Sequence, residues 1–432
     1  MLDMKELREN AELQEAVQRT ADRKGIPFNV GEWLERDEDR RNLLQQVEGL
    51  RQDRNRYSSE ISKVLREGQG EQAEKLKLQV KEIQGDLAAY EDQLREIEEV
   101  WQQLAMLAPN IVSPDTPDGF SDQDNVELRT FGEKPLFGYT LKDHVELGEM
   151  HRLVDIPRGV KTAGTRSYYL TGHGALLHRA VQQLALDLLL NKGFTLLDVP
   201  LMVRTEALNH TAFFPLGQEQ TIQMAEQDKW LVGTAEVPLV SYYSGETVDV
   251  SQPLKLAAAS LCFRSEVGSA GRDVRGLYRV HQFAKVEQVI ICEANLEVAE
   301  TLHQEMTAHA EELLQLLELP YRVVAVCAGD MSQKTYKQFD IETWMPSRGA
   351  YGETHSSSNL LDFQARRSGI RYRDHEGRLR YCYTLNNTAV ASPRILIPLL
   401  ENHQQEDGSV LIPAALQPYM NGLARLAVSS GS

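Results

Sequence analysis

Leu261-Cys-Phe-Arg-Ser-Glu266, followed after a glycine-rich stretch by Arg279-Val-His-Gln-Phe283-Ala-Lys-Val-Glu287, says most about the fold of this 432-residue chain. Both runs have the composition and length of strands, and the glycines between them predict a hairpin. Arg264 and Glu266 lie two residues apart at the end of the first strand, so both project from one sheet face. Arginine binds phosphate through parallel hydrogen bonds, and the ring of Phe283 offers a face on which a purine can stack. The hairpin is therefore a candidate site for a nucleotide together with a small zwitterion.

The connection between the two strands separates a binding hairpin from a plain structural one. An arginine and a glutamate on one strand are often only a surface salt bridge, so Arg264 and Glu266 alone decide little. The connection, however, combines glycines with cations, namely Gly268, Gly271, Gly276, Arg272, Arg275 and Arg279. A structural hairpin has little use for three arginines, and the stretch favours nucleotide binding.

The composition argues against several classes of protein. A net charge of -17 does not suit non-specific nucleic-acid binding, which needs clustered lysine and arginine to displace phosphate counterions. No run of about 18 apolar residues is present, and the charged start of the chain, Met1–Glu6, lacks the apolar core of a secretory signal. Four cysteines without Cys-x-x-Cys spacing indicate neither a zinc site nor a disulfide framework. We expect a cytoplasmic protein that contacts no membrane.

Two stretches near the N-terminus carry heptad spacing of apolar residues. The first contains Leu43, Val47, Leu50, Tyr57, Ile61 and Val64, and the second contains Leu76, Val80, Ile83, Leu87, Tyr90, Leu94, Ile97, Trp101 and Leu104. Gly68 and Gly70 between them suit a tight reversal. We predict an antiparallel coiled-coil hairpin over about residues 38–107, inside an N-terminal domain of residues 1–110.

The two predicted arm helices differ in charge. Residues 40–66 hold seven lysines and arginines against three acids, whereas residues 71–107 hold four against nine. One interpretation is a pair of solvated helix faces that attract one another. The other is a first helix that follows a phosphate backbone, with Arg51, Arg54 and Arg56 as candidate contacts. The second becomes attractive only if the remainder of the chain handles RNA.

A proline-rich linker, Pro109–Pro117, marks the boundary to a second domain of residues 111–432. Beyond an amphipathic helix near residues 174–192, most segments have strand character, and only a few helices separate them, chiefly residues 295–318 and a helix after Ser392. This order favours an α+β fold with helices packed on an antiparallel sheet.

Residues 263–287 resemble motif 2 of the class II aminoacyl-tRNA synthetases, and the wording of Gly271–Phe283 is similar to the bacterial-type seryl-tRNA synthetase family. The resemblance covers nearly the whole chain. It includes the heptad hairpin, Gly233–Pro238, Phe363–Arg367, Thr384–Thr388 leading into Ser392–Arg394, and residues 174–200, which resemble the dimer-forming motif 1. It implies an antiparallel-sheet class II catalytic domain, an N-terminal antiparallel coiled-coil arm and a homodimer.

The resemblance also implies an ATP site with Mg²⁺. Arg264 would contact the α-phosphate, Glu266 the adenine edge and Phe283 the adenine face. Arg394 would contact the γ-phosphate, and we expect Ser392 and Pro393 to begin a helix that has Arg394 at its N-terminus. Glu353 and Ser356 would hold the metal, which prefers hard oxygen ligands. The resemblance also implies that Ser265, Arg279, Thr354 and His355 bind ATP. Arg264 and Arg394 would be the catalytic residues.

For the amino acid, the resemblance implies that Thr234, Ala235 and Glu236 receive the amino group of L-serine, beside Arg264. Glu287 and Thr388 would lie near its side chain. The implied activity is that of a serine–tRNA ligase, which forms seryl-adenylate from serine and ATP and transfers serine to the 3′ end of serine tRNA, with selenocysteine tRNA as a further possible substrate. The arm would grip the long variable arm of the tRNA.

Several residues depart from the family pattern. Gly352 replaces an arginine before Glu353, Ser357 replaces a cysteine, and residues 210–215 and 332–335 differ in wording. Pro398 follows Pro393 in the expected helix, where an interior proline would cost about 3 kcal/mol or kink the helix. These departures leave two alternatives open. One is a specialised serine-activating paralogue that serves inhibitor resistance or a biosynthetic pathway, and the other is a catalytically silent protein that binds RNA or a partner.

Overall fold

The computed structural model describes residues 1–267 and 275–428, and it divides the chain into two compact units. One unit is residues 3–109, and the other is residues 110–432 together with Met1–Leu2. Gly268, Gly271 and Arg272 of the hairpin connection lie outside the described residues. No helix in the described ranges combines the length and the apolar character that crossing a membrane requires.

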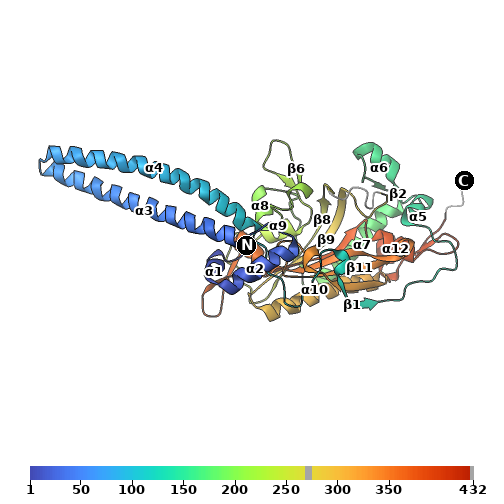
Figure 1. The fold of residues 1–432 in the computed structure, drawn as a ribbon. Helices are drawn as coiled ribbons and strands as arrows, with labels where there is room; N and C mark the ends of the chain where they lie inside the picture. The colour runs from blue at the N-terminus through green and yellow to red at the C-terminus, as the bar shows by residue number, and fades with distance from the viewer. Residues whose placement is uncertain (268–274, 429–432) are drawn as a thin grey trace. The chain divides into compact units, whose positions relative to one another are not determined.

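The first unit consists of four helices, α1 (Met4–Glu9), α2 (Ala11–Lys24), α3 (Val30–Arg66) and α4 (Gly70–Leu107). Figure 1 shows α3 and α4 running side by side as a long antiparallel hairpin. Buried Val47, Leu87 and Leu94 form its seam, so the predicted coiled-coil arm is confirmed. The first arm helix starts earlier than expected, because the Asn29 side chain accepts from Glu32 N at 2.9 Å and caps it.

The second unit is built on an eight-stranded sheet. Its order is β1 (Val126–Phe131), β10 (Tyr321–Ala325), β11 (Lys337–Met345), β12 (Ala350–Asn359), β15 (Tyr383–Ser392), β9 (Gln282–Cys292), β8 (Leu254–Phe263) and β4 (Thr195–Leu196). Neighbouring strands are antiparallel except for β4 and β8. The predicted antiparallel sheet is confirmed, whereas β12 was not foreseen, because its run of glycine, serine and threonine lacks an apolar pattern.

Smaller elements surround this sheet (Figure 1). The helices are α5 (His144–Met150), α6 (Ile156–Ala163), α7 (His173–Asn191), α8 (Thr205–His210), α9 (Glu236–Ser241), α10 (Leu296–Leu316), α11 (Phe363–Ser368) and α12 (Leu396–Asn402). Short 3-10 helices are η1 (Asp122–Asp124), η2 (Gln218–Gln220), η3 (Ala328–Asp330), η4 (Pro346–Arg348) and η5 (Ala414–Met420). The minor strands are β2 (Val154–Asp155), β3 (Tyr169–Leu170), β5 (Met202–Val203), β6 (Ile222–Gln223), β7 (Trp230–Leu231), β13 (Arg371–Arg373), β14 (Leu379–Tyr381), β16 (Val410–Leu411) and β17 (Arg425–Leu426).

The strand β9 separates the main core from the polar face of the sheet. Val286 and Ile290 pack into one apolar cluster with residues of α7 and α10. Because successive side chains alternate between faces, Lys285 and Glu287 project to the opposite face. There Val289 joins a second cluster with residues of α9 and α11. Apolar clusters therefore cover both faces of β9, and Lys285 and Glu287 are buried on the face of the second cluster.

Candidate active site

The end of the β8–β9 hairpin gathers the residues predicted to bind a nucleotide. The Arg264 guanidinium carbon lies 5.3 Å from the centre of the Phe283 ring. Both Arg264 and Glu266 lie beyond Phe263, the last residue of β8, so the prediction that strand alternation turns them to one sheet face is wrong. Glu266 has a positive φ of 53° and forms a 3.6 Å ion pair with Arg279. Ser265 Oγ donates to the carbonyl of Glu219 at 2.6 Å, so it anchors the turn. These five predicted residues therefore meet at one end of the two strands.

A buried polar cluster surrounds Glu236, the first residue of α9. Its Oε1 accepts hydrogen bonds from Lys334 Nζ at 2.6 Å, Gln364 Nε2 at 2.7 Å and Asn386 Nδ2 at 3.0 Å. Thr234 is buried in the same turn, where its Oγ1 accepts from Glu236 N at 3.2 Å. Burial lowers the pKa of Lys334, and the charge of Glu236 opposes that effect. Lys334, Gln364 and Asn386 were not among the site residues predicted from the sequence.

A second buried carboxylate lies next to this cluster. Glu287 on β9 is 1% exposed, and its Oε2 is 2.6 Å from Lys285 Nζ. Burial raises the pKa of Glu287, with Lys285 acting against it and Glu236 adding to it. Thr388 pairs with Glu287 across β15 and β9, and its Oγ1 accepts from Lys285 Nζ at 3.5 Å. Two carboxylates and two ammonium groups thus share one desolvated region.

Gly233 connects the residues predicted to bind a nucleotide with the buried polar cluster around Glu236. Arg264 Nε donates to the carbonyl of Gly233 at 3.4 Å, and Gly233 directly precedes Thr234. Ala235, which follows, is fully buried as the N-cap residue of α9. The guanidinium of Arg264, which suits a phosphate, therefore bonds to the residue directly before the buried polar cluster of Thr234 and Glu236.

A β-bulge in β12 brings Glu353 and Ser356 to the same face of the sheet. Glu353 pairs with Glu342 and His355 pairs with Ile341, so Thr354 is an extra residue in β12. Without the bulge, side chains three positions apart would point to opposite faces. Ser356 pairs with Asp340, whose pKa is raised well above its usual range by burial and by the charge of Glu353.

The residues on this face fit a magnesium ion. Mg²⁺ is usually held by one or two carboxylates, with water and phosphate oxygens completing the shell. Glu353 offers an exposed carboxylate, and the hydroxyl of Ser356 accepts from Gln338 Nε2 at 3.1 Å. A cation here would also relieve the repulsion between Glu353 and Asp340. Sequence reasoning missed Asp340, and its position opposite Ser356 is visible only in the register.

Thr354 and His355 differ from their neighbours on β12. Both are buried, and His355 Nδ1 lies 2.8 Å from Thr354 Oγ1. Thr354 Oγ1 also lies 2.6 Å from Thr343 Oγ1. Burial lowers the pKa of His355 to about 3, so its ring is neutral. The side chains of Thr354 and His355 therefore hydrogen-bond to each other and to Thr343, and not to Glu353.

Arg394 lies beside Glu353 and Tyr278. Its Nη1 is 3.5 Å from Glu353 Oε2 and donates to the Glu353 carbonyl at 3.2 Å. Its Nε donates to the carbonyl of Tyr278 at 3.1 Å, and its guanidinium carbon lies 4.4 Å from the centre of the Tyr278 ring. The structure therefore brings Arg394 and Glu353 together.

Two expectations about the segment after β15 are wrong. Ser392 is the last residue of β15, and its hydroxyl lies 2.7 Å from His178 Nδ1, so it does not cap a helix. The helix α12 begins only at Leu396. Pro398 is therefore in the first turn, where a backbone N–H has no helical partner, and the expected cost of about 3 kcal/mol does not arise.

Family models match segments in both units of the chain. Residues 1–112 match the family model for the seryl-tRNA synthetase N-terminal domain, and residues 220–403 match the tRNA synthetase class II core domain (G, H, P, S and T). The serine–tRNA ligase of Deinococcus radiodurans is 47% identical over 424 residues, which cover 98% of each chain. That of Rubrobacter xylanophilus is 42% identical over 422 residues, 97% of this chain and 98% of the relative.

Solved structures show the same likeness over the full chain. Seryl-tRNA synthetase from Pyrococcus horikoshii complexed with ATP has a TM-score of 0.89 and 35% identity, and the match covers 100% of both chains. Cytoplasmic serine–tRNA ligase from Naegleria fowleri in complex with AMP has a TM-score of 0.81 and 27% identity, over 96% of both chains.

Proposed function

The chain belongs to the seryl-tRNA synthetase family and has the function of a serine–tRNA ligase, and we propose that the residues described above carry its two steps. In the first, a carboxylate oxygen of L-serine attacks the α-phosphorus of ATP, and the bond to the leaving pyrophosphate breaks. In the second, the terminal ribose hydroxyl of tRNA attacks the carbonyl carbon of seryl-adenylate, and AMP leaves. No covalent enzyme intermediate is needed, so positioning and charge neutralisation supply the catalysis.

The hydrogen bond from Arg264 to the carbonyl of Gly233 carries this proposal. It joins the arginine that would contact the α-phosphate to the turn of Thr234 and Glu236. In our proposal Arg264 neutralises the α-phosphate, while Phe283 and Glu266 receive the adenine. Ser265 and Arg279 hold the turn. Arg394 contacts the γ-phosphate. The buried region around Glu236 and Glu287 then lies where an amino acid must approach the α-phosphate.

We assign the serine pocket to the two buried carboxylates and Thr388. Glu236, with Thr234 and Ala235, receives the ammonium group, and Glu287 with Thr388 receives the hydroxyl. A pocket that hydrogen-bonds a hydroxyl rejects alanine by about 10⁴-fold or more, because alanine would leave buried polar groups unpaired. The hydrogen bonds from Lys334, Gln364 and Asn386 hold the Glu236 carboxylate in a fixed orientation.

Mg²⁺ is the proposed cofactor, held by Glu353 and Ser356. When bound, it would neutralise phosphate charge. Arg394, which is 3.5 Å from Glu353 Oε2 here, would then divide its contacts between Glu353 and phosphate oxygens.

We further propose that residues 1–110 bind tRNA and that residues 111–432 form the catalytic domain. The arm would grip the long variable arm of serine tRNA through the basic α3 helix, with Arg51, Arg54 and Arg56 as phosphate contacts. Because residues 174–200 resemble motif 1, we propose a homodimer. ATP and tRNA are cytoplasmic substrates, and we propose that the protein acts in the cytoplasm.

The decisive experiment is serine-dependent ATP–pyrophosphate exchange with magnesium, followed by charging of serine tRNA. We expect exchange with serine, none with alanine, and charging of tRNA at its 3′ end. A protein that binds ATP but shows no exchange would overturn the proposal. Neither the specialised paralogue nor the silent binding protein is favoured by the full-length similarity to serine–tRNA ligases.

A further inference from the structure

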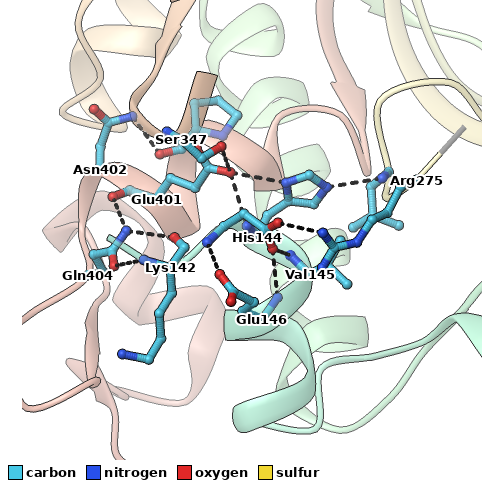
Figure 2. Close-up of polar contacts among 12 residues, drawn as sticks. Lys142, His144, Val145, Glu146, Arg275, Ser347, Glu401, Asn402 and Gln404 are labelled. Atoms are coloured by element: carbon cyan, nitrogen blue, oxygen red, sulfur yellow. Dashed lines mark hydrogen bonds and ion pairs between the residues drawn. The ribbon is translucent and has the colours of Figure 1, made fainter. Parts of the chain in front are cut away.

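Glu401 on α12 is a fully buried carboxylate at the centre of a polar network outside the proposed serine pocket (Figure 2). Its Oε1 accepts from the backbone N of His144 at 3.0 Å, from His144 Nδ1 at 3.1 Å and from Ser347 Oγ at 2.9 Å. Its Oε2 accepts from the backbone N of Ser347 at 3.0 Å. One carboxylate therefore joins the start of α5 to the turn η4.

The tautomer of His144 follows from its second contact. The backbone N–H of Leu277 donates to His144 Nε2 at 3.2 Å, so Nε2 is an acceptor. The ring proton then lies on Nδ1 and points to Glu401. His144 thus transmits the position of a buried carboxylate to the backbone of the β8–β9 hairpin.

The chain passes so close to His144 that only glycine fits before Leu277. Gly276 has a φ of +92°, and a Cβ at that position would lie 2.2 Å from His144 Nε2. Both the conformation and the space therefore require glycine. Arg275, one residue earlier, pairs with Asp143 at 3.3 Å, so consecutive residues of the hairpin are held against the start of α5 (Figure 2).

Tyr278 follows Leu277 and connects this network to the proposed ATP site. Its carbonyl accepts from Arg394 Nε at 3.1 Å, and its hydroxyl donates to the Glu353 carbonyl at 3.3 Å. The guanidinium carbons of Arg394 and Arg348 lie 4.4 and 4.3 Å from the centre of its ring. Arg348 directly follows Ser347, the other residue that Glu401 holds.

A purely structural role for the network is the competing explanation. Capping of α5 does not need His144, because the Asp143 side chain accepts from Val145 N and Glu146 N, both at 2.9 Å. The two sets of contacts made by Glu401 instead both lead to Tyr278. One runs through His144 and Leu277, and the other runs through Ser347 and Arg348. This convergence on one side chain beside Arg394 favours a role in the ATP site.

We propose that Glu401 and His144 are positioning residues for ATP. They hold the backbone of Leu277 and the turn of Ser347, so that the Tyr278 ring and carbonyl set the guanidinium of Arg394 toward the phosphates, with Arg348 over the same ring. This inference rests on the proposed function of Arg394.

The test compares His144→Asn, His144→Gln and Gly276→Ala with the unaltered protein. Asparagine can replace Nδ1 as donor to Glu401 but offers no acceptor at the Nε2 position, whereas glutamine can place an acceptor near Leu277. We expect His144→Asn and Gly276→Ala to raise the Kd for magnesium-ATP, measured by calorimetry, about tenfold, and His144→Gln to raise it about threefold or less. In pyrophosphate exchange the KM for ATP should rise equally, while the KM for serine stays within about twofold.

Gly377→Ala is the matched control, because Gly377 has a φ of +77° and open space around its missing Cβ. It should carry the same backbone strain without changing the Kd for ATP. Calorimetry reports on ATP binding whether or not exchange occurs, so failure of the proposed function and failure of this inference are distinguishable. The inference is overturned if the variants lose only thermal stability, if ATP and serine constants change together, or if Asn and Gln at position 144 behave alike.

Discussion

Lys334 Nζ lies 2.6 Å from Glu236 Oε1, and both side chains are buried. The carboxylate also accepts from two amides, whereas the ammonium group lies 4.0 Å from the centre of the Phe213 ring. Removal of Glu236 would therefore leave a desolvated cation without its carboxylate. The pair makes the proposed serine pocket sensitive to single substitutions.

Glu236→Gln should destabilise the protein by about 3 kcal/mol, because breaking a buried ion pair from one side leaves an uncompensated charge. Urea unfolding followed by circular dichroism measures the change. Glu312→Gln is the control, since Glu312 forms an exposed pair with Lys192 at 2.7 Å and should cost at most about 1 kcal/mol. Equal losses in the two variants would contradict the prediction.

Phe283→Ala should raise the KM for ATP about tenfold in pyrophosphate exchange, because stacking of a base on an aromatic ring contributes about 1–3 kcal/mol. Arg264→Ala should instead lower kcat by about 10²-fold or more, since it removes a charge that neutralises the transition state. The KM for ATP and the kcat are measured separately. The assignment fails if Phe283→Ala lowers kcat alone and leaves the KM unchanged.

His303 should make the protein less stable as the pH falls from about 6.5 to about 4. Burial lowers its pKa from 6.5 to about 4, so between these values the unfolded chain binds more protons than the folded protein. The unfolding free energy should fall between pH 6.5 and pH 4.5 in the unaltered protein. In His303→Asn this fall should be smaller by about 1–2 kcal/mol. Identical pH dependence in the two proteins would disprove this contribution.

On the arm, the triple variant Arg51→Ala, Arg54→Ala, Arg56→Ala should weaken tRNA charging about tenfold and flatten its salt dependence, with pyrophosphate exchange unchanged. Arg51 pairs with Glu91 of α4 at 2.7 Å, so part of the basic charge also joins the two helices. Arg95→Ala on α4, which removes an exposed pair with Asp92 at 2.8 Å, is the control. Unchanged charging in the triple variant would contradict a role of these arginines as phosphate contacts.

Pro398→Ala should change the free energy of unfolding by no more than about 0.5 kcal/mol, since Pro398 is in the first turn of α12. Leu399→Pro should cost about 3 kcal/mol or more, because Leu399 N donates to Ile395 O at 3.3 Å. Both are measured by urea unfolding. A gain of several kcal/mol in Pro398→Ala would show that the native proline strains the helix.

Local patterns were sufficient for much of the fold. The seam of Val47, Leu87 and Leu94 follows heptad spacing, which is a property of one helix and is visible in its sequence. Strand β12 was not predicted from the sequence, because Ala350–Asn359 has no alternation of apolar residues. Its pairing with β11 depends on residues elsewhere in the chain. The cap at Ser392 was misplaced because its hydroxyl meets His178, more than 200 residues earlier.

The sequence by itself determined the helical hairpin, the two strands β8 and β9 and the residue types of the proposed site, because periodicity and short motifs are local properties of the chain. Tertiary structure alone decided which residues meet. It brought Lys334 and Gln364 to Glu236, used a bulge at Thr354 to turn Glu353 and Ser356 to one face, and set Glu401 against His144. These contacts join segments that are far apart in the sequence. Those on strands also depend on register, because a shift of one residue would turn every side chain to the opposite face of the sheet. No local pattern therefore specifies them.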